Sequence, residues 1–364
     1  MPAEQRSALD AEDALPDELP PELAARLQKR GGTATIYDIA ELAGVNPSTV
    51  SRALSKPGRI SAKTEKRIRA AAERLEFRFN PMARALPTGR THTLALVVAD
   101  ITNPMFFGIV RGAEQAASAA GYTLIITESQ ESGANEAEAI SRVLPSVDGL
   151  VLATTRLDDE RISEIAARKP LVAINRDIGG VASVLPEIEA GVTDLLEHLV
   201  GHGHRTVSYL SGPENSWISR RRWEILLDVA ERLDVGLVEI GPNPPTIEGG
   251  RAAWRRVIAA RPTAVIAFND LMAIGVIQSA AAAGVSVPGS LSVAGFDDIF
   301  GSELIVPALT TVRAQLVLAG QLAVEKLLGQ IDDDADVAVD EPLATKLIVR
   351  ESTAEARSGP WSTG

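Results

Sequence analysis

The chain of 364 residues contains no cysteine, and aromatic residues make up only 4 % of it. The missing thiols exclude disulfide frameworks, cysteine-ligated zinc, iron–sulfur clusters and cysteine nucleophiles. No apolar run approaches the roughly 20 residues that cross a bilayer. Acidic residues such as Glu4, Asp10 and Glu12 occupy the positions where a signal peptide needs an apolar core. We therefore expect a soluble, cytoplasmic protein with no membrane partner.

Signatures of catalysis are also missing. The chain has no Gly-x-Ser-x-Gly elbow, Walker A loop or Gly-x-Gly-x-x-Gly strand turn. His198, His202 and His204 have a spacing that a metal site could use, but Gly201 and Gly203 should end the helix between them. An ordinary turn between a helix and a strand is the preferred interpretation. We expect no enzyme activity, cofactor or metal.

The net charge of −12 is unevenly distributed along the chain. Residues 34–90 carry eleven basic and five acidic side chains, whereas residues 1–33 carry four basic and seven acidic ones. A basic module joined to an acidic body is typical of a chain in which one domain binds nucleic acid. The acidic, proline-containing segment 1–33 predicts a mobile tail, with room for a helical turn near residues 21–29.

Residues 35–78 predict three short helices. Thr35 is a suitable N-cap for the first, Gly44 permits a tight turn, and Ser61 is a suitable N-cap for the third. A second helix over 47–54 would follow the turn, an arrangement that places it in the DNA major groove. Its polar face offers short hydroxyl donors for phosphates and the Arg52 guanidinium for guanine. The alternative is an ordinary three-helix cluster with a polar face.

Beyond residue 92, continuous apolar runs alternate with helical segments, which predicts an α/β domain of parallel sheets covered on both faces. The runs are 94–99, 123–127, 149–153, 171–174, 207–210, 265–268 and 292–296. Ligands bind beyond the carboxyl ends of such strands. The polar residues there are Asp100, Asn103, Asn175, Arg176, Asn269, Asp270, Asp297 and Asp298. They predict a cleft for a ligand with many hydroxyl groups.

The stretch TIYDIAELAGVNPSTVSRAL, residues 35–54, resembles the opening of the lactose/galactose-repressor (LacI/GalR) family. The match continues in the family's order through 61–64, 80–86, 100–104 and on to Val349-Arg-Glu-Ser-Thr353. This resemblance implies an N-terminal helix-turn-helix DNA-binding domain and a two-lobed, periplasmic-binding-protein-like effector domain. The expected segments are a tail (1–33), the helix-turn-helix (34–78), a hinge helix and linker (79–91), the effector-binding and dimerisation domain (92–353) and a C-terminal tail (354–364).

The resemblance also implies which residues contact DNA. They are Thr35, Tyr37, Asn46, Pro47, Ser48, Thr49, Ser51, Arg52, Asn80, Ala83, Arg84 and Leu86. In the hinge, Asn80-Pro81 and Pro87 bound a helix too short to be stable alone, so it should order only on DNA. Leu86 would then wedge open the central base step in the minor groove. A simple interdomain linker is the alternative for this segment.

By the same matching, Arg222, Asn269 and Asp297 would bind effector hydroxyls. The remaining expected effector contacts are Asn103, Asn175 and the ring-stacking candidates Phe106, Phe107 and Trp217. Some positions depart from the family pattern, among them Ala314 where many members carry Gln, so the ligand could be unusual.

These features together predict a homodimeric regulator, most simply a repressor of carbohydrate-use genes. Its partners would be a pseudo-palindromic operator and a small sugar-like effector that releases the protein from DNA or retains it there. The alternatives are a cytoplasmic sugar-binding protein without DNA regulation and a regulator that responds to another ligand, such as a nucleobase. A sugar-modifying enzyme with an appended regulator domain is a further alternative, but the expected effector domain over residues 92–353 leaves no obvious room for a catalytic domain.

Overall fold

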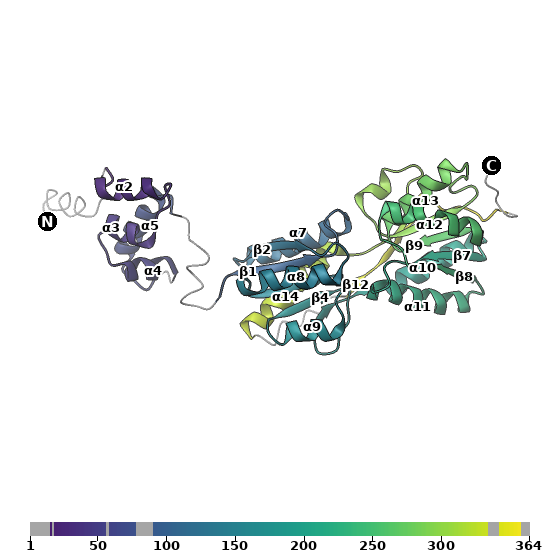
Figure 1. Ribbon diagram of the computed structural model, residues 1–364, viewed down its shortest axis with the longest axis horizontal. Coiled ribbons are helices and arrows are strands. Elements are labelled where there is room, and N and C mark those ends of the chain that lie inside the picture. Colours follow the sequence, from purple (N-terminus) through teal and green to yellow (C-terminus); the bar gives the residue numbers. More distant parts are fainter. Residues whose placement is uncertain (1–14, 17, 56–57, 78–89, 334–341, 358–364) are drawn as a thin grey trace. The chain divides into compact units, whose positions relative to one another are not determined.

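The computed structural model describes residues 15–16, 18–55, 58–77, 90–333 and 342–357, and Figure 1 shows the elements they form. The chain divides into two compact units, residues 1–88 and 89–364. The described part of the first unit is helical, whereas the second contains the strands. Among the described residues, no helix is both long and apolar enough to pass through a bilayer.

The first unit contains the predicted helix-turn-helix. Its helices are α3 (Ile36–Leu42), α4 (Pro47–Ser55) and α5 (Ala62–Arg74). Thr35 caps α3 in a capping box with Asp38, and the Ser61 hydroxyl accepts the Thr64 N–H at 3.2 Å. Gly44, with φ of 60°, makes the tight turn between α3 and α4. Ile39, Val50 and Ile68, one from each helix, are fully buried in a shared core.

The described part of segment 1–33 is packed rather than mobile, and its helix coincides with the helical turn expected near residues 21–29. Helix α2 (Pro21–Lys29) buries Leu23 completely in the helix-turn-helix core. Leu15, Leu19 and Leu27 pack against the same core. These leucines recur at helical spacing, so burial of their apolar side chains outweighs the polar composition from which the tail was inferred.

The second unit begins with an N-terminal lobe around a five-stranded parallel sheet of order β2-β1-β3-β4-β5. The strands are β1 (Thr93–Val98), β2 (Thr123–Glu128), β3 (Gly149–Ala153), β4 (Leu171–Ile174) and β5 (Ala182–Val184). Leu94 and Leu96 of β1 pack with α7 (Met105–Ala119) and α14 (Leu316–Asp332). Ala95 and Val97 point to the other face, beneath α8 (Gly133–Val143) and α9 (Asp159–Ala166).

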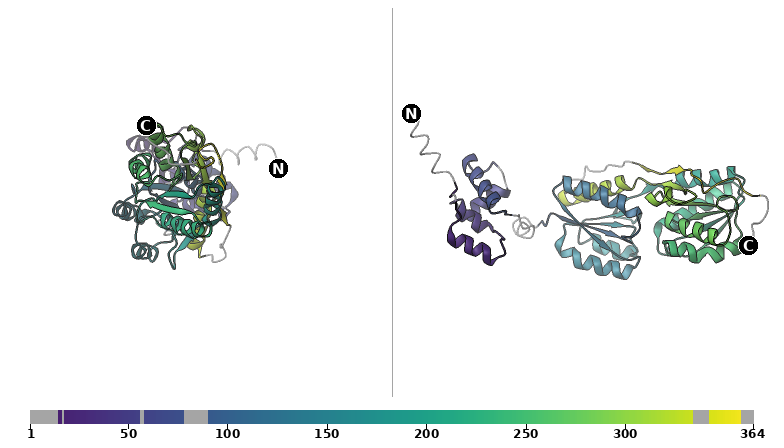
Figure 2. Two further views of the ribbon diagram at one scale, coloured as in Figure 1. Left: turned by 90° about the vertical axis from the view of Figure 1, so that its right-hand side faces the viewer. Right: turned by 90° about the horizontal axis from the view of Figure 1, so that it is seen from above.

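The C-terminal lobe is built around a six-stranded sheet of order β13-β11-β10-β9-β7-β8, in which only β13 is antiparallel to its neighbour. The strands are β7 (Thr206–Leu210), β8 (Gly236–Ile240), β9 (Ala264–Ala267), β10 (Ser292–Asp297), β11 (Thr310–Arg313) and β13 (Lys346–Ile348). The helices are α10 (Ile188–Gly201), α11 (Trp217–Arg232), α12 (Ile247–Ala260) and α13 (Asp270–Ala282). Helices α10 and α11 cover one face, and α12 and α13 the other (Figures 1 and 2).

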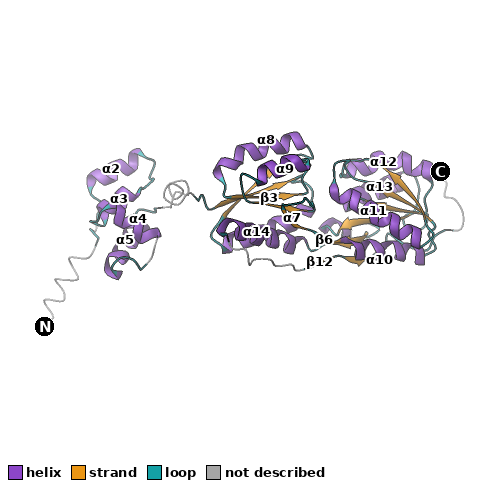
Figure 3. Ribbon diagram, turned by 90° about the horizontal axis from the view of Figure 1, so that it is seen from below, coloured by secondary structure: helices purple, strands orange, loops and turns teal. Residues whose placement is uncertain are grey.

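Short strands connect the two lobes. β6 (Pro186–Glu187) pairs with β12 (Leu343–Ala344) between them (Figure 3). The short helices η1 (Leu144–Ser146) and η2 (Phe300–Glu303) complete the described elements. Ala354 and Ala356 bond to Ser292 and His202, so the lobe extends past the expected limit at residue 353.

All seven predicted apolar runs form strands, which confirms the α/β fold. The other strands were missed because each is short or interrupted by polar residues; they are β5, β6, β8, β11, β12 and β13. β2 differs from the expected buried strand, since it lies at an edge and exposes Ile125 and Ile126 by 37 % and 39 %.

Candidate effector pocket and DNA-binding helix

A cavity lies between the lobes where the strands of both sheets end. Its lining consists of Asn103, Met105, Phe106, Glu131, Thr154, Arg156, Asn175, Ile218, Arg222, Pro245, Phe268, Asn269 and Asp297. The cavity has a volume of 20 Å³, room for about one water molecule. The pocket is therefore nearly filled by its own side chains in this structure.

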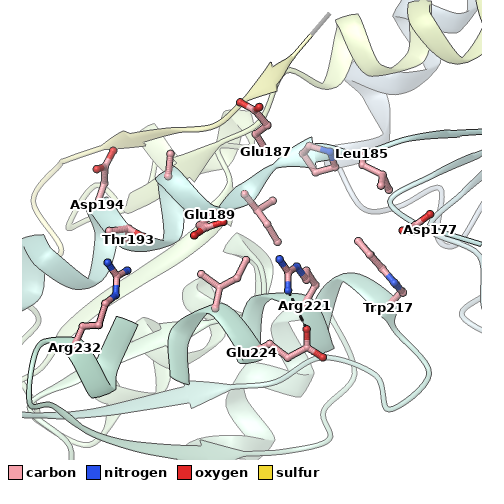
Figure 4. Close-up of a pocket in the computed structure, with 14 residues that line it drawn as sticks. Asp177, Leu185, Glu187, Glu189, Thr193, Asp194, Trp217, Arg221, Glu224 and Arg232 are labelled. Carbon is pink, nitrogen blue, oxygen red and sulfur yellow. Dashed lines mark hydrogen bonds and ion pairs between the residues drawn. The ribbon is translucent and has the colours of Figure 1, made fainter. Parts of the chain in front are cut away.

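The structure brings together six of the eight residues predicted to bind effector. They are Asn103, Phe106, Asn175, Arg222, Asn269 and Asp297. Phe107 is 52 % exposed and does not line the cavity. Trp217 lines a different cavity of 910 Å³ between α10 and α11, where Figure 4 shows it near Arg221. Contact of the six residues with an effector stays a prediction.

Arg222 is held firmly at the centre of the pocket. Its Nη1 donates to the Phe268 carbonyl at 2.6 Å, and its Nη2 lies 3.4 Å from Asp297 Oδ1. The guanidinium lies over the Phe296 ring, 4.2 Å from its centroid. A Cβ at Gly212 would lie 2.7 Å from the Phe268 ring, so glycine is required for this packing. The pocket therefore presents a preorganised set of donors.

Two buried polar atoms that line the pocket lack hydrogen-bond partners among the described residues. They are Thr154 Oγ1 and Arg222 Nε. Unpaired buried polar groups are costly, and a polar ligand would relieve that cost. Thr154, Asn175 and Asp297 also have positive φ values of 59°, 59° and 104°. Such backbone is unfavourable for side chains other than glycine and often occurs at binding sites.

Two buried carboxyl groups support the C-terminal lobe's side of the pocket. Burial raises the pKa of Asp297, although the neighbouring Arg222 opposes the shift. Burial, together with the nearby Asp297, raises the pKa of Asp270 to about 8. Asp270 accepts hydrogen bonds from Ser302 Oγ at 2.7 Å and Thr311 Oγ1 at 2.6 Å. It therefore fixes the loop after β10 and does not line the cavity.

The sequence motifs missed an ion pair on the N-terminal lobe's side. Arg156 Nε donates to Glu131 at 2.7 Å, and Arg156 Nη1 donates to the Thr154 carbonyl at 2.8 Å. Thr154 directly follows β3. It therefore meets the same criterion as Asn175 after β4, namely a polar residue at the carboxyl end of a parallel strand, and could have been predicted in the same way. Glu131 and Pro245 also line a neighbouring cavity of 710 Å³.

Helix α4 carries the predicted DNA contacts. Asn46, Ser48 and Arg52 are exposed, while Val50 and Ala53 on its other face are buried in the core. Thr49 and Ser51 are half-buried, and Tyr37 of α3 is 68 % exposed. The expected hinge contacts lie outside the described residues. They are Asn80, Ala83, Arg84 and Leu86.

The three histidines have hydrogen-bond partners on their own lobe. His198 Nε2 lies 2.9 Å from Thr353 Oγ1, and His204 Nε2 lies 3.0 Å from the Ala354 carbonyl. Burial lowers the pKa of both. These bonds fasten the C-terminal segment to the turn after α10.

A helix-turn-helix unit, joined in one chain to two α/β lobes that enclose a polar pocket, defines a ligand-responsive DNA-binding regulator. Residues 35–80 match the bacterial regulatory proteins of the lacI family, and residues 196–353 match a periplasmic binding protein-like domain. The chain belongs to the LacI family, whose members are DNA-binding transcriptional regulators rather than enzymes. The family resemblance and the two-domain architecture are thereby confirmed.

Three relatives illustrate the match. The probable HTH-type transcriptional repressor ExuR of Bacillus subtilis is 32 % identical over 331 residues, which cover 87 % of this chain and 98 % of that protein. The ribose operon repressor of Halalkalibacterium halodurans is 28 % identical over 323 residues, with 88 % and 97 % covered. The crystal structure of the lac repressor dimer bound to operator and the anti-inducer ONPF is 26 % identical, with a TM-score of 0.78 and 88 % and 99 % covered.

Proposed function

We propose that this protein is a homodimeric repressor that binds a pseudo-palindromic operator and responds to a small polyhydroxylated effector. The observation that carries the proposal is the joint presence of an exposed polar recognition helix and a polar cavity between lobes. The similar proteins include an operator-bound repressor dimer and a ribose operon repressor. Because a repressor must meet its DNA operator, the proposal also locates the protein in the cytoplasm.

The recognition helix supplies two kinds of DNA contact. Ser48 and Thr49 lie in the first turn of α4, where short hydroxyl groups can donate to phosphates. Arg52 lies in its last turn and is exposed, so its guanidinium can reach guanine O6 and N7 together. Two copies of α4 in a dimer would read half-sites about one helical turn apart.

Exposed apolar side chains support pairing of two chains. Phe300, Leu304 and Val306, on η2 and just after it, are 66 %, 73 % and 90 % exposed. Ile125 and Ile126 lie on the free edge of β2. A patch of this kind on the surface of a folded chain commonly marks a protein interface, and an exposed edge strand invites a partner.

The pocket chemistry favours a sugar or a related polyol. Arg222 and Asn269 supply donors, while Asp297 and Glu131 supply acceptors, and Phe106 and Phe268 offer ring faces. Alternating donors and acceptors suit adjacent hydroxyl groups, each of which both donates and accepts. The proposal leaves the sign of control open, so the effector can act as an inducer or as a corepressor.

The test is to incubate the purified protein with sheared genomic DNA near physiological salt and to sequence the retained fragments. We expect a shared pseudo-palindrome, and the neighbouring genes will indicate which sugars to titrate. The Arg52→Ala variant should lose about 1–3 kcal/mol of discrimination between the recovered operator and scrambled DNA while it keeps its non-specific affinity. Absence of any enriched motif, with and without candidate sugars, would refute the regulator.

A further inference from the structure

Helix α2 lies outside the family match, which begins at residue 35, yet it is part of the DNA-binding unit. Leu23 is fully buried against the core that includes Ile39 and Ile68 of the helix-turn-helix. The Arg74 guanidinium at the end of α5 also donates to the Pro16 carbonyl. The extension is therefore a fourth packed helix of this unit.

The basic end of α2 pairs with the acidic side chains of α3. Arg26 donates to Glu41 and lies 3.6 Å from Asp38, and Arg30 Nη1 lies 3.1 Å from Asp38 Oδ2. Arg26 and Arg30 belong to the extension, whereas both carboxylates belong to the family's own helix-turn-helix. The two arginines thus compensate charge that the family unit carries by itself.

Asp38 is ionised despite its burial. It is only 1 % exposed, and burial acts to raise its pKa. Hydrogen bonds from the Thr35 hydroxyl at 2.7 Å and the Thr35 N–H at 2.8 Å, together with Arg30 and Arg26, lower the pKa below its ordinary value. A full negative charge therefore persists in α3 at neutral pH.

The same helix presents a predicted DNA contact. Tyr37 is 68 % exposed and lies four residues before Glu41, hence on the same face of α3. A phosphate that approaches Tyr37 also approaches Glu41, and charges closer together than one Debye length, ~8 Å at physiological salt, act on each other. Without compensation, the carboxylates would repel it.

We propose that Arg26 of α2 and Arg30, the residue after α2, neutralise Asp38 and Glu41 so that the Tyr37–Glu41 face of α3 can lie against operator phosphates. The inference rests on the proposed DNA binding, and it makes the extension an electrostatic part of the DNA surface. The two arginines act through the carboxylates and are positioning residues. Phosphate contacts carry no sequence information, so the effect applies equally to operator and scrambled DNA.

The experiment uses the full-length chain and a labelled duplex that carries the recovered operator, with affinity measured between 50 and 300 mM KCl. Arg26→Ala should weaken binding about three- to tenfold at 50 mM and by less than about twofold at 300 mM, because salt screens the exposed repulsion. Arg26→Ala combined with Glu41→Gln should restore wild-type affinity, and Arg26→Lys should retain it. Glu41→Gln alone, which leaves the core intact, should tighten binding at 50 mM.

Arg69→Ala is the matched control, since it removes an equally charged side chain of the same unit, 56 % exposed and paired with Glu65 at 2.6 Å. It should weaken binding less than Arg26→Ala does. A double variant as weak as Arg26→Ala would mean that Arg26 touches phosphate itself, and it would overturn the neutralisation. If the wild type binds its operator but Arg26→Ala and Glu41→Gln bind it with the same affinity, the neutralisation proposal is overturned. The proposed function as a DNA-binding regulator would not be affected. Failure of the wild type to bind DNA would instead refute the proposed function.

Discussion

Arg222 can have two roles, since the same side chain bonds to the C-terminal lobe and offers a hydrogen-bond donor to a ligand. Its Nη atoms are already bonded to the Phe268 carbonyl and Asp297, and its Nε has no partner among the described residues. A ligand hydroxyl that bonds Nε would gain a donor that is already desolvated and oriented. The side chain thus supports the pocket wall and offers a binding contact.

The Arg222→Ala variant should bind effector about 10- to 100-fold more weakly, since hydrogen bonds to charged groups contribute about 1.5–3 kcal/mol. Its affinity for operator in the absence of effector should change by less than about twofold. The measurement is operator release during an effector titration. Arg221→Ala is the control, because Arg221 pairs with Glu224 beside the other cavity (Figure 4). A normal response from Arg222→Ala would show that the effector binds elsewhere.

Asp270 should make the stability of the protein depend on pH. Its pKa is about 8 in the folded chain and near 3.8 in the unfolded chain. Between these values the folded state binds more protons, so the free energy of unfolding falls as pH rises toward 8. Asp270→Asn should show a smaller fall in melting temperature between pH 5 and 8.5. Equal slopes for the two proteins would contradict the raised pKa.

At the scale of elements, α2 shows how tertiary packing can stabilise a helix whose local signals are weak. The signals for α3, α4 and α5 are strong caps and a glycine turn, and the helices begin where those signals occur. Helix α2 has proline as its N-cap and makes no side-chain cap bond. Nine residues with such an end would be marginal alone, so α2 owes its stability to the leucines that it buries.

Leu23→Ala tests that dependence. Removal of a fully buried leucine side chain should cost about 2–5 kcal/mol, borne by the DNA-binding unit. Hydrogen exchange followed by mass spectrometry should show faster exchange in α2 and α3, while β1 and β7 of the other unit remain as protected as in the wild type. Unchanged protection in α3 would mean that α2 is dispensable for the unit's core.

At the scale of the whole molecule, regulation requires that the cleft and the DNA-binding surface be linked. If the proposed effector occupies the inner cavity of 20 Å³, we expect the cavity to widen through a change in the angle between the lobes. To move operator occupancy from about 99 % to 1 %, the effector must favour one state by roughly 5.5 kcal/mol. In a dimer, the two subunits would change between the DNA-bound and released states together, because they share one interface.

Leu304→Lys tests the proposed dimer. A charge placed on a 73 % exposed leucine should leave the fold intact and weaken dimerisation about tenfold or more. Operator affinity should fall as well, because a single recognition helix reads only one half-site. Sedimentation velocity provides the measurement, with Leu227→Lys, on the outer face of α11 and 44 % exposed, as the control. Equal dimer populations in both variants would exclude this surface.

Much of the molecule follows from local sequence because its signals are local. Caps and glycine turns specify the helix-turn-helix, and apolar runs of four to six residues specify the buried strands, whatever lies around them. Asn103, Asn175, Asn269 and Asp297 follow from the same logic, since strand ends of a parallel sheet converge at one edge. These residues were predicted and the structure brings them together.

Tertiary packing decided the rest. Phe107 and Trp217 have the same chemistry as Phe106, but the direction of each side chain depends on what packs around its helix, and only Phe106 lines the inner pocket. The Arg156–Glu131 pair joins residues 25 apart in the chain, a distance that no local pattern spans. Helix α2 has leucines at helical spacing but no side-chain cap, and it is stable because those leucines meet a hydrophobic core supplied by three other helices. Contacts between residues far apart in the chain, which local patterns do not specify, determined each of these features.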